Sequence, residues 1–279
     1  MSSMLQKTII ITGCSSGIGA YAARQLKALG WRVFATARNS QDIEALEQDG
    51  LEAFYLDYRD EASIEALVKV VLEKTGGTLD ALYNNGAYAL PGAVEDLPLD
   101  ALRELFEANF FGWHSLTRKI VPVMRRQGHG RIVHCSSILG RVPMKWRGAY
   151  VASKYALEGL MLVQRMELQG TGIEVSLIEP GPIATRFTYN AAKQAEKHID
   201  MAASVHHDLY LRQMQKLKSG GTQSKDKLGP EAVFDVLLHA LEAAKPRPHY
   251  LVTRPAKLGV IAQRFMPMRW FYKMLSGQS

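Results

Sequence analysis

Short apolar runs alternate with longer amphipathic segments along most of this 279-residue chain. The runs have the length of β-strands, and apolar residues in the longer segments recur at the three- and four-residue spacing of a half-buried helix. Such alternation is typical of a doubly wound α/β fold, a parallel sheet with helices on both faces. The expected strands are Thr8–Thr12, Arg32–Ala37, Ala53–Leu56, Leu79–Tyr83, Arg131–Cys135, Glu174–Ile178 and His249–Val252. The expected helices are Ile18–Leu29, Glu61–Lys74, Leu102–Met124, Tyr150–Leu168 and Pro230–Ala244.

Composition agrees with one globular domain over residues 1–279. Hydrophobic residues make up 47% of the chain and charged residues 22%, which excludes disordered and disulfide-scaffold classes. The two cysteines, Cys14 and Cys135, have no C-x-x-C spacing, and Met1–Lys7 lacks the features of an export signal. There is also no apolar run of membrane-spanning length. We therefore expect a reduced, cytoplasmic protein.

Residues 189–228 do not fit the alternation of strands and helices. This segment is polar, helix-prone and rich in Met, His and Lys, and it separates the sixth strand from the next helix. An insertion at this place is typical of a cover over a binding site. We expect it to act as a substrate lid that offers these apolar side chains: Met201, Leu209, Tyr210, Leu211 and Met214.

Residues 254–279 form a basic tail. They contain five basic residues and no acid, so the rest of the chain carries only +2 of the net charge of +7, and nucleic acid is not an expected partner. We expect an apolar stripe, interrupted by Pro267, to pack on the protein's own surface or on a second subunit. A helix lying on an anionic membrane is the alternative, which is not favoured because Pro267 shortens each helix. The stripe consists of Val260, Ile261, Phe265, Met268, Phe271 and Leu275.

The first strand runs directly into the glycine turn Gly13-Cys-Ser-Ser-Gly-Ile-Gly19, which a helix follows. Glycines let the backbone approach a pyrophosphate closely, and the free N–H groups of the helix favour its negative charge. The turn also satisfies G-x-S-x-G, the nucleophile elbow of α/β-hydrolases, with Ser15 as nucleophile. That reading is not favoured because no strand precedes Thr8 to supply an oxyanion loop.

The second strand ends at Arg38, about twenty residues after the glycines, where an acidic residue would bind the ribose hydroxyls of NAD. A guanidinium group suits the 2′-phosphate of NADP instead. The position of Arg38 therefore favours NADP(H).

Tyr150 and Lys154 are four residues apart at the start of a helix, so their side chains lie on one face. A free tyrosine has a pKa of about 10, and a nearby ammonium group favours its phenolate form. The pair therefore indicates general acid–base chemistry by Tyr150, with Lys154 lowering the pKa of the phenol.

Three further motifs complete a constellation. Ser137 lies thirteen residues before Tyr150 at a strand end, Asn109-Phe-Phe-Gly112 lies in the preceding helix, and Glu179-Pro-Gly-Pro182 follows the sixth strand. With the T-G-x-x-x-G-x-G turn, these motifs resemble the short-chain dehydrogenase/reductase family, and most closely its hydroxysteroid and retinol dehydrogenase branch. The one departure is Asn84-Asn-Gly-Ala87, where the family has Asn-Asn-Ala-Gly.

The resemblance implies a sheet of about seven strands and a role for each matching residue. Tyr150 would exchange the proton, Ser137 would hold the substrate oxygen, Lys154 would act on Tyr150, and Asn109 would anchor a water of the proton relay. Asp57 would contact the adenine, and Ile183 and Thr185 the nicotinamide carboxamide. The full set of implied cofactor residues is Gly13, Ser15, Ser16, Gly17, Ile18, Gly19, Arg38, Asp57, Asn85, Gly86, Tyr150, Lys154, Pro180, Gly181, Ile183 and Thr185.

The function predicted from the sequence is an NADP(H)-dependent oxidoreductase that interconverts an alcohol and a ketone or aldehyde. Its substrate is expected to be a small molecule, a medium-sized or bulky apolar alcohol or carbonyl compound, and the enzyme a homodimer or homotetramer. The alternative is a dinucleotide-binding sensor without catalysis, although such relatives usually lack one of the four catalytic residues that are all present here as Asn109, Ser137, Tyr150 and Lys154. No metal site is expected, because the eight histidines show no metal-binding spacing.

Overall fold

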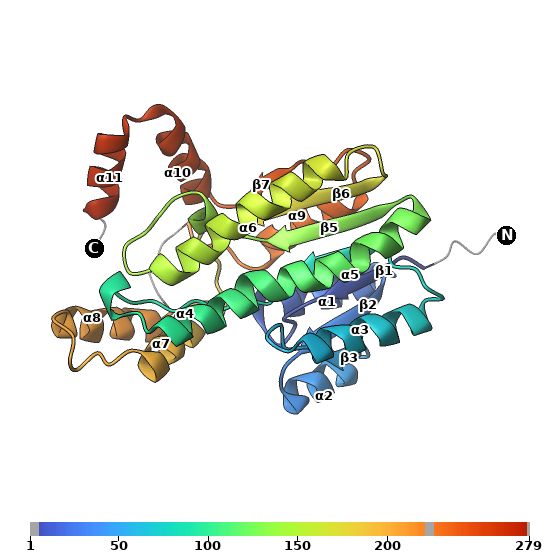
Figure 1. Ribbon diagram of the computed structural model, residues 1–279, viewed down its shortest axis with the longest axis horizontal. Helices are drawn as coiled ribbons and strands as arrows, with labels where there is room; N and C mark the ends of the chain where they lie inside the picture. Colours follow the sequence, from blue (N-terminus) through green and yellow to red (C-terminus); the bar gives the residue numbers. More distant parts are fainter. Residues whose placement is uncertain (1–5, 221–225, 278–279) are drawn as a thin grey trace.

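The computed structural model describes residues 6–220 and 226–277 and contains one seven-stranded parallel sheet (Figure 1). The strands lie in the order β3-β2-β1-β4-β5-β6-β7. They are β1 (Thr8–Ile11), β2 (Arg32–Ala37), β3 (Glu52–Tyr55), β4 (Ala81–Asn84), β5 (Gly130–Cys135), β6 (Ile173–Glu179) and β7 (His249–Leu251). The doubly wound fold and the seven strands predicted from the sequence are confirmed. Parts of the expected N-terminus, lid and tail (1–5, 221–225 and 278–279) lie outside the described residues.

The central strands are apolar along their whole length because both faces of the sheet are covered. Ile9, Ile10 and Ile11 of β1 are completely buried, and β1 pairs with β2 on one side and β4 on the other. The strand order reverses at β1 and β4, since β2 and β3 lie on one side and β5 to β7 on the other. A reversal of this kind opens a crevice at the carboxyl ends of the strands.

Helices cover both faces of the sheet. Figure 1 shows α3, α5 and α6 over one face, and α1 packs against α9 on the other. The helices of the sheet region are α1 (Gly17–Ala28), α2 (Ser40–Gln48), α3 (Glu61–Lys74), α4 (Leu99–Phe106), α5 (Gly112–Gln127), α6 (Gly148–Glu167) and α9 (Glu231–Glu242), with short 3-10 turns η1 (Val94–Asp96) and η3 (Ile138–Gly140). The helix α2 was not expected from the sequence.

The helix expected over Leu102–Met124 is not a single α-helix. The chain is helical from α4 through α5, but five residues between them, η2 (Glu107–Phe111), form a π-helix. A π-turn accommodates one extra residue and commonly marks a functional position. Here it contains Asn109, whose side chain bonds to neighbouring elements instead of facing solvent.

The predicted lid contains two helices, α7 (Phe187–His198) and α8 (His207–Lys218), which build a second apolar cluster with α4 and the start of α6. Tyr210 and Met214 are buried in that cluster, Met201 and Leu209 are half-buried, and Leu211 is exposed. The Tyr210 hydroxyl donates to Asp96 and accepts from the Ala93 amide. The helices therefore form a packed cover, whose role as a lid stays a prediction.

The basic tail forms α10 (Arg254–Phe265) and α11 (Met268–Ser276), with the break at Pro267 that the sequence predicts. The expected packing of its stripe on the protein's own surface is seen in part, with Val260 and Leu275 half-buried, and its packing on a second subunit stays a prediction. Phe271 is completely buried, but Ile261, Phe265 and Met268 are exposed, because the chain supplies no surface opposite them. No helix in the described part of the chain has the length and apolarity needed to cross a bilayer.

Candidate active site

The glycine turn lies in the crevice between the ends of β1 and β4. Gly13 and Gly17 have φ angles of +69° and +60°, which strain any side chain with a Cβ. A Cβ on Gly13 would lie 2.5 Å from Gly86 Cα, and one on Gly19 would lie 2.4 Å from the Gly13 oxygen. The turn can therefore pack against the loop after β4 only with glycine at these positions.

Thr12 joins the turn to the loop after β4. Its hydroxyl oxygen accepts hydrogen bonds from the amides of Asn85 (2.8 Å) and Gly86 (3.1 Å), and Asn85 Nδ2 donates to the Thr12 carbonyl (3.0 Å). Tyr58, buried beneath, places its hydroxyl 2.7 Å from both Thr12 Oγ1 and Asn84 Oδ1. Sequence reasoning missed Thr12 and Tyr58, although the threonine between strand and glycine was a usable signal. The exchanged order of Gly86 and Ala87 leaves the Asn85 contacts intact.

A surface hollow opens at the N-terminus of α1. Ser16 is the N-cap residue of this helix but makes no side-chain capping bond, so it does not cover the first N–H groups. Free helix N–H groups and nearby guanidinium groups suit a pyrophosphate, so the residues present fit a dinucleotide. The lining contains no acid and no histidine and consists of Ser15, Ser16, Gly17, Ala20, Tyr21, Arg24, Gln25, Ala184, Thr185, Arg186, Lys227 and Pro230. Ser15 thus has no nearby base, and the hydrolase reading has no support.

Arg38 and Asp57 lie at the ends of β2 and β3. Arg38 is exposed and makes no hydrogen bond or ion pair within the described residues, so its guanidinium can receive a ligand. Asp57 is half-buried and pairs with Arg59 at 2.7 Å. Burial alone would raise the pKa of Asp57, but the hydrogen bonds and charge of Arg59, with a contribution from Arg38, hold it below its usual value. Asp57 is therefore ionised and oriented by Arg59.

Tyr150 and Ser137 come together at the carboxyl end of the sheet. Ser137 follows β5, and Tyr150 lies in the first turn of α6 and is only 7% exposed. Burial raises the pKa of the Tyr150 phenol above its usual value, and a hydrogen bond with Ser137 only partly opposes this effect. The lowered pKa expected from Lys154 is thus not seen in the protein alone. The phenol is protonated, as a proton donor must be.

Lys154 is completely buried below Tyr150. Its ammonium donates to the Cys135 carbonyl at 2.9 Å and lies 4.1 Å from the centre of the Trp113 ring. The distance to the centre of the Tyr150 ring is longer, 5.7 Å, because the ammonium is directed toward β5 and α5. Burial lowers the pKa of Lys154 to about 8. Trp113, which sequence reasoning missed, also donates from Nε1 to the Gly86 carbonyl at 2.9 Å.

Asn109 is completely buried in the π-turn η2. Its side-chain amide accepts from the Tyr88 amide (3.1 Å) and donates to the Tyr88 carbonyl (2.8 Å) and to Ser153 Oγ (3.3 Å). Ser153 in turn donates to the Tyr150 carbonyl at 2.8 Å. Asn109 therefore ties the loop after β4 to α6, and its expected role in a proton relay stays a prediction.

The loop after β6 lies beside the glycine turn and is held by backbone bonds. The Ile138 amide donates to the Pro180 carbonyl at 3.0 Å, and Ile183 forms a bridge with Leu228. A Cβ on Gly181 would lie 2.1 Å from Thr253 Oγ1, so only glycine fits there. Of the expected residues in the loop, Thr185 does contact the turn, since its methyl group lies against Gly17.

Apolar side chains cover Tyr150. The Phe187 ring, at the start of α7, lies 5.5 Å from the Tyr150 ring in an edge-to-face arrangement, and Ala89, Leu139 and Ala191 complete the group. Trp146 lies nearby, against Tyr210 of the cover, with a φ of +65°. A bulky residue in this conformation is strained, and such strain is concentrated at functional sites.

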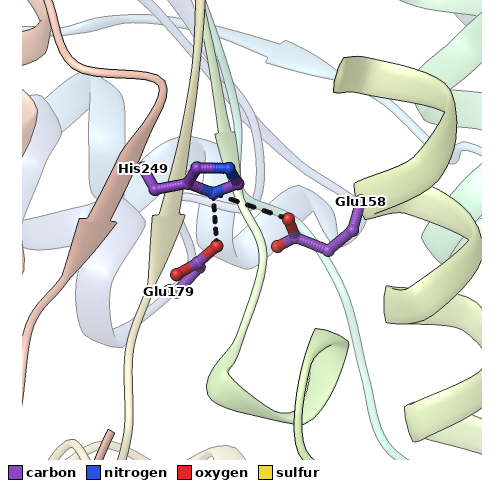
Figure 2. Close-up of side chains that lie close together, drawn as sticks. All are labelled: Glu158, Glu179 and His249. Atoms are coloured by element: carbon purple, nitrogen blue, oxygen red, sulfur yellow. Dashed lines mark hydrogen bonds and ion pairs between the residues drawn. The ribbon is translucent and has the colours of Figure 1, made fainter. Parts of the chain in front are cut away.

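A largely buried acidic cluster joins α6 to the strands β6 and β7 (Figure 2). Glu158, one turn after Lys154, faces Glu179 of β6 and His249 of β7, and within the described residues these three form a group with metal-ligand spacing. His249 Nδ1 is 2.6 Å from Glu179 Oε1, and Arg141 donates to the same oxygen at 3.3 Å. Burial and the charge of Glu179 raise the pKa of Glu158 to about 7. The cluster is an ion-pair network in which Arg141 and His249 both contact Glu179.

Comparisons with known proteins agree with this geometry. The short chain dehydrogenase family matches residues 7–196. The oxidoreductase YbbO of Escherichia coli is 37% identical, over 98% of this chain and 96% of its own, and human 17-beta-hydroxysteroid dehydrogenase type 1 is 31% identical, over 95% and 80%. The crystal structure of a variant actinorhodin polyketide ketoreductase with NADPH superposes with a TM-score of 0.72 at 28% identity, over 90% and 97% of the two chains. The protein belongs to the short-chain dehydrogenase/reductase family and is an oxidoreductase of that family.

Proposed function

We propose that this protein is an NADP(H)-dependent oxidoreductase that interconverts an alcohol and a ketone or aldehyde, with Tyr150 as its general acid and base. One observation carries the proposal. Tyr150 and Ser137 are hydrogen-bonded beside the crevice at the end of the sheet, and Lys154 is buried one turn further along the same helix. A non-catalytic sensor would not need a protonated phenol held at that place.

Each residue has a separate task in the proposed reduction. The bound cofactor would supply a hydride to the carbonyl carbon. The Tyr150 hydroxyl donates its proton to the carbonyl oxygen, and Ser137 holds that oxygen within reach. Lys154 stabilises the phenolate left behind, and Asn109 keeps the loop after β4 against the catalytic helix. Oxidation of the alcohol is the reverse, with the phenolate as base.

The preference for NADP(H) is supported by Arg38 at the end of β2, whose exposed guanidinium has no hydrogen bond or ion pair in the part of the chain that the structure describes. It can form a charge-assisted pair with a 2′-phosphate, whereas NAD(H) offers only hydroxyl groups there. The ketoreductase with NADPH is a structural relative that binds this dinucleotide. The α1 hollow, with its arginines and helix N–H groups, would receive the pyrophosphate.

An apolar substrate is supported by the surroundings of Tyr150. Phe187, Leu139 and Ala191 would contact any substrate that reaches the phenol, and none of them carries a charge. The relatedness to a 17-beta-hydroxysteroid dehydrogenase agrees with a bulky apolar alcohol or carbonyl compound. Small charged keto acids would find no partner among these side chains.

The test is the consumption of NADPH and NADH, followed at 340 nm, with a panel of steroid, retinoid and aliphatic ketones, aldehydes and small keto acids. We expect NADPH-dependent turnover of an apolar carbonyl compound. NADPH binding without turnover of any compound in either direction would favour the sensor, and equal kcat/KM for both cofactors would refute the NADP(H) preference. The cytoplasmic location and the homodimeric or homotetrameric state stay predictions from the sequence.

A further inference from the structure

We propose that α10 and α11, here called the C-terminal hairpin, dock on the surface of an anionic phospholipid bilayer. The hairpin buries two side chains, Ala256 and Phe271. Most of its other large apolar residues are exposed, with Phe265 76% and Trp270 67% exposed, while Val260, Met266 and Leu275 are half-buried. The exposed set comprises Leu258, Ile261, Phe265, Met268, Trp270, Tyr272 and Met274. An apolar surface gathered on one small element marks an interaction site.

The hairpin is fixed to the body of the protein, so the apolar residues are presented at a defined place. Thr253 caps α10 through a bond from the Ala256 amide at 3.3 Å. Gln263 donates to the Arg141 carbonyl at 2.7 Å, and Lys145 donates to the Ser276 carbonyl. With Phe271 completely buried, both helices are held while their outer sides stay open.

Basic residues flank the exposed apolar residues. Leu258, Ile261 and Phe265 are spaced by three and four and share one side of α10. Lys257 and Arg264 each directly precede one of these three residues. On α11, a surface hollow is lined by Arg269, Trp270, Lys273 and Met274. Apolar residues between basic ones are typical of a helix in the plane of a membrane interface, where long basic side chains reach the headgroups.

The positive charge of the hairpin favours a bilayer over a second copy of the chain as its binding partner. The hairpin contains five basic residues and no acid, and none of the five forms an ion pair within the described residues. In a two-fold dimer through this face, the same basic residues would oppose each other and repel. Anionic headgroups neutralise them while the acyl region receives the apolar side chains. Trp270 and Tyr272 are also the residue types that gather at membrane interfaces.

The orientation that follows is specific. Figure 1 shows α10 and α11 at the same end of the molecule as α7 and α8, the end toward which the β5 arrow points. A docked hairpin therefore holds the carboxyl end of the sheet, with the candidate active site, toward the bilayer.

The experiment uses the full-length protein and phosphatidylcholine vesicles with or without phosphatidylserine, separated by sedimentation. We expect binding to vesicles that contain phosphatidylserine, weaker binding as salt rises, and little binding to phosphatidylcholine alone. Reversing two charges of α11 with Arg269→Glu and Lys273→Glu should weaken binding by at least about twentyfold, since each basic residue at the surface contributes about fivefold. Phe265→Ser with Trp270→Ser should abolish binding at low salt.

The matched control is Arg125→Glu with Arg126→Glu, which makes the same change in net charge at exposed positions in the last turn of α5, a helix separate from the hairpin. It should retain most of the binding. Circular dichroism and thermal unfolding verify that every variant is folded. Equal weakening by both charge variants would overturn the proposal, because net charge and not the hairpin would then be responsible. Failure of the wild type to bind, or a dimer that Phe265→Ser with Trp270→Ser dissociates, would also overturn it.

Discussion

The candidate catalytic residues and the α7–α8 cover lie next to each other but are held by different kinds of contact. Around the catalytic residues, side chains form hydrogen bonds to the main chain of distant elements, such as Asn109 to Tyr88, Lys154 to Cys135 and Trp113 to Gly86. In the cover, apolar side chains such as Tyr210, Met214 and Leu217 pack together, and the polar contacts lie at the edge of this cluster, such as those from the Tyr210 and Ser204 hydroxyls to Asp96.

This difference separates the two regions by function. Hydrogen bonds are directional and fix an atom to within tenths of an ångström, whereas apolar contacts tolerate changes of shape. Substitutions among the catalytic residues should therefore change the rate of the chemical step. Substitutions in the cover should change stability and the range of substrates.

The largest effect is expected from Tyr150→Phe, which removes the proton donor and keeps the ring that packs on Phe187. Turnover should fall by roughly a hundred- to ten-thousandfold, the usual contribution of a general acid. Affinity for NADPH, measured by fluorescence, should stay nearly unchanged. The control is Tyr155→Phe, five residues further along α6, whose hydroxyl bonds to the Arg141 carbonyl away from the site. If the two variants kept similar activity, Tyr150 would not be the acid.

Met214→Ala tests the cover. Met214 is 7% exposed within the second apolar cluster, so the variant should lose about 2–5 kcal/mol of the free energy of unfolding, measured with urea. Phe265→Ala, on the C-terminal hairpin, removes a larger side chain that is 76% exposed and should change stability by less than about 0.5 kcal/mol. NADPH affinity should be kept in both. Equal losses would mean that Phe265 is buried in solution, and would contradict the contrast between the cover and the hairpin.

The features that the sequence could predict are those that depend on local residue patterns. The strands around Ile9–Ile11 are local apolar runs, and Ser137, Tyr150 and Lys154 have a local spacing that the family resemblance interprets. The structure accordingly has the predicted sheet and brings these three residues together. Their roles still await the variants described here.

Features that depend on tertiary contact were not predictable. The π-turn at Asn109 is stabilised by bonds to Tyr88 and Ser153, neither of which a local helical pattern reveals. The contact of Trp113 with Lys154 joins two helices far apart in the chain. Phe265 and Phe271 belong to the same apolar stripe, yet only Phe271 meets a surface, since burial depends on what the rest of the fold places opposite.

A smaller effect is expected from Arg38→Leu, at the end of β2 where we propose that the 2′-phosphate of NADP(H) binds. Loss of the pair with the 2′-phosphate should lower the ratio of kcat/KM for NADPH to that for NADH by about ten- to a hundredfold. The chemical step is expected to be unaffected, since Arg38 lies at the end of β2, away from Tyr150. Arg125→Leu, exposed at the far end of α5, is the control and should leave the ratio unchanged. An unchanged ratio in Arg38→Leu would mean that this residue does not select the cofactor.

The smallest effect is expected from replacing Trp113, which should shift the pH dependence of activity. It tests whether the contacts around the candidate catalytic residues set their chemistry. The Trp113 ring attracts the Lys154 ammonium at 4.1 Å, and burial has already lowered the pKa of Lys154 to about 8. Activity that needs the ammonium should therefore fall as the pH rises through about 8. In Trp113→Leu the charged form of Lys154 loses its contact with the ring, so the pKa of Lys154 falls further. The decline of activity then moves to lower pH, by about 0.5–1 unit for an attraction of about 0.5–1.5 kcal/mol.

Trp113→Phe retains an aromatic face but, like Trp113→Leu, loses the Nε1 bond to the Gly86 carbonyl. Both variants should thus share any rise in KM for NADPH, while only Trp113→Leu shifts the pH profile fully. Equal profiles in the two variants would show that the ring does not act on Lys154.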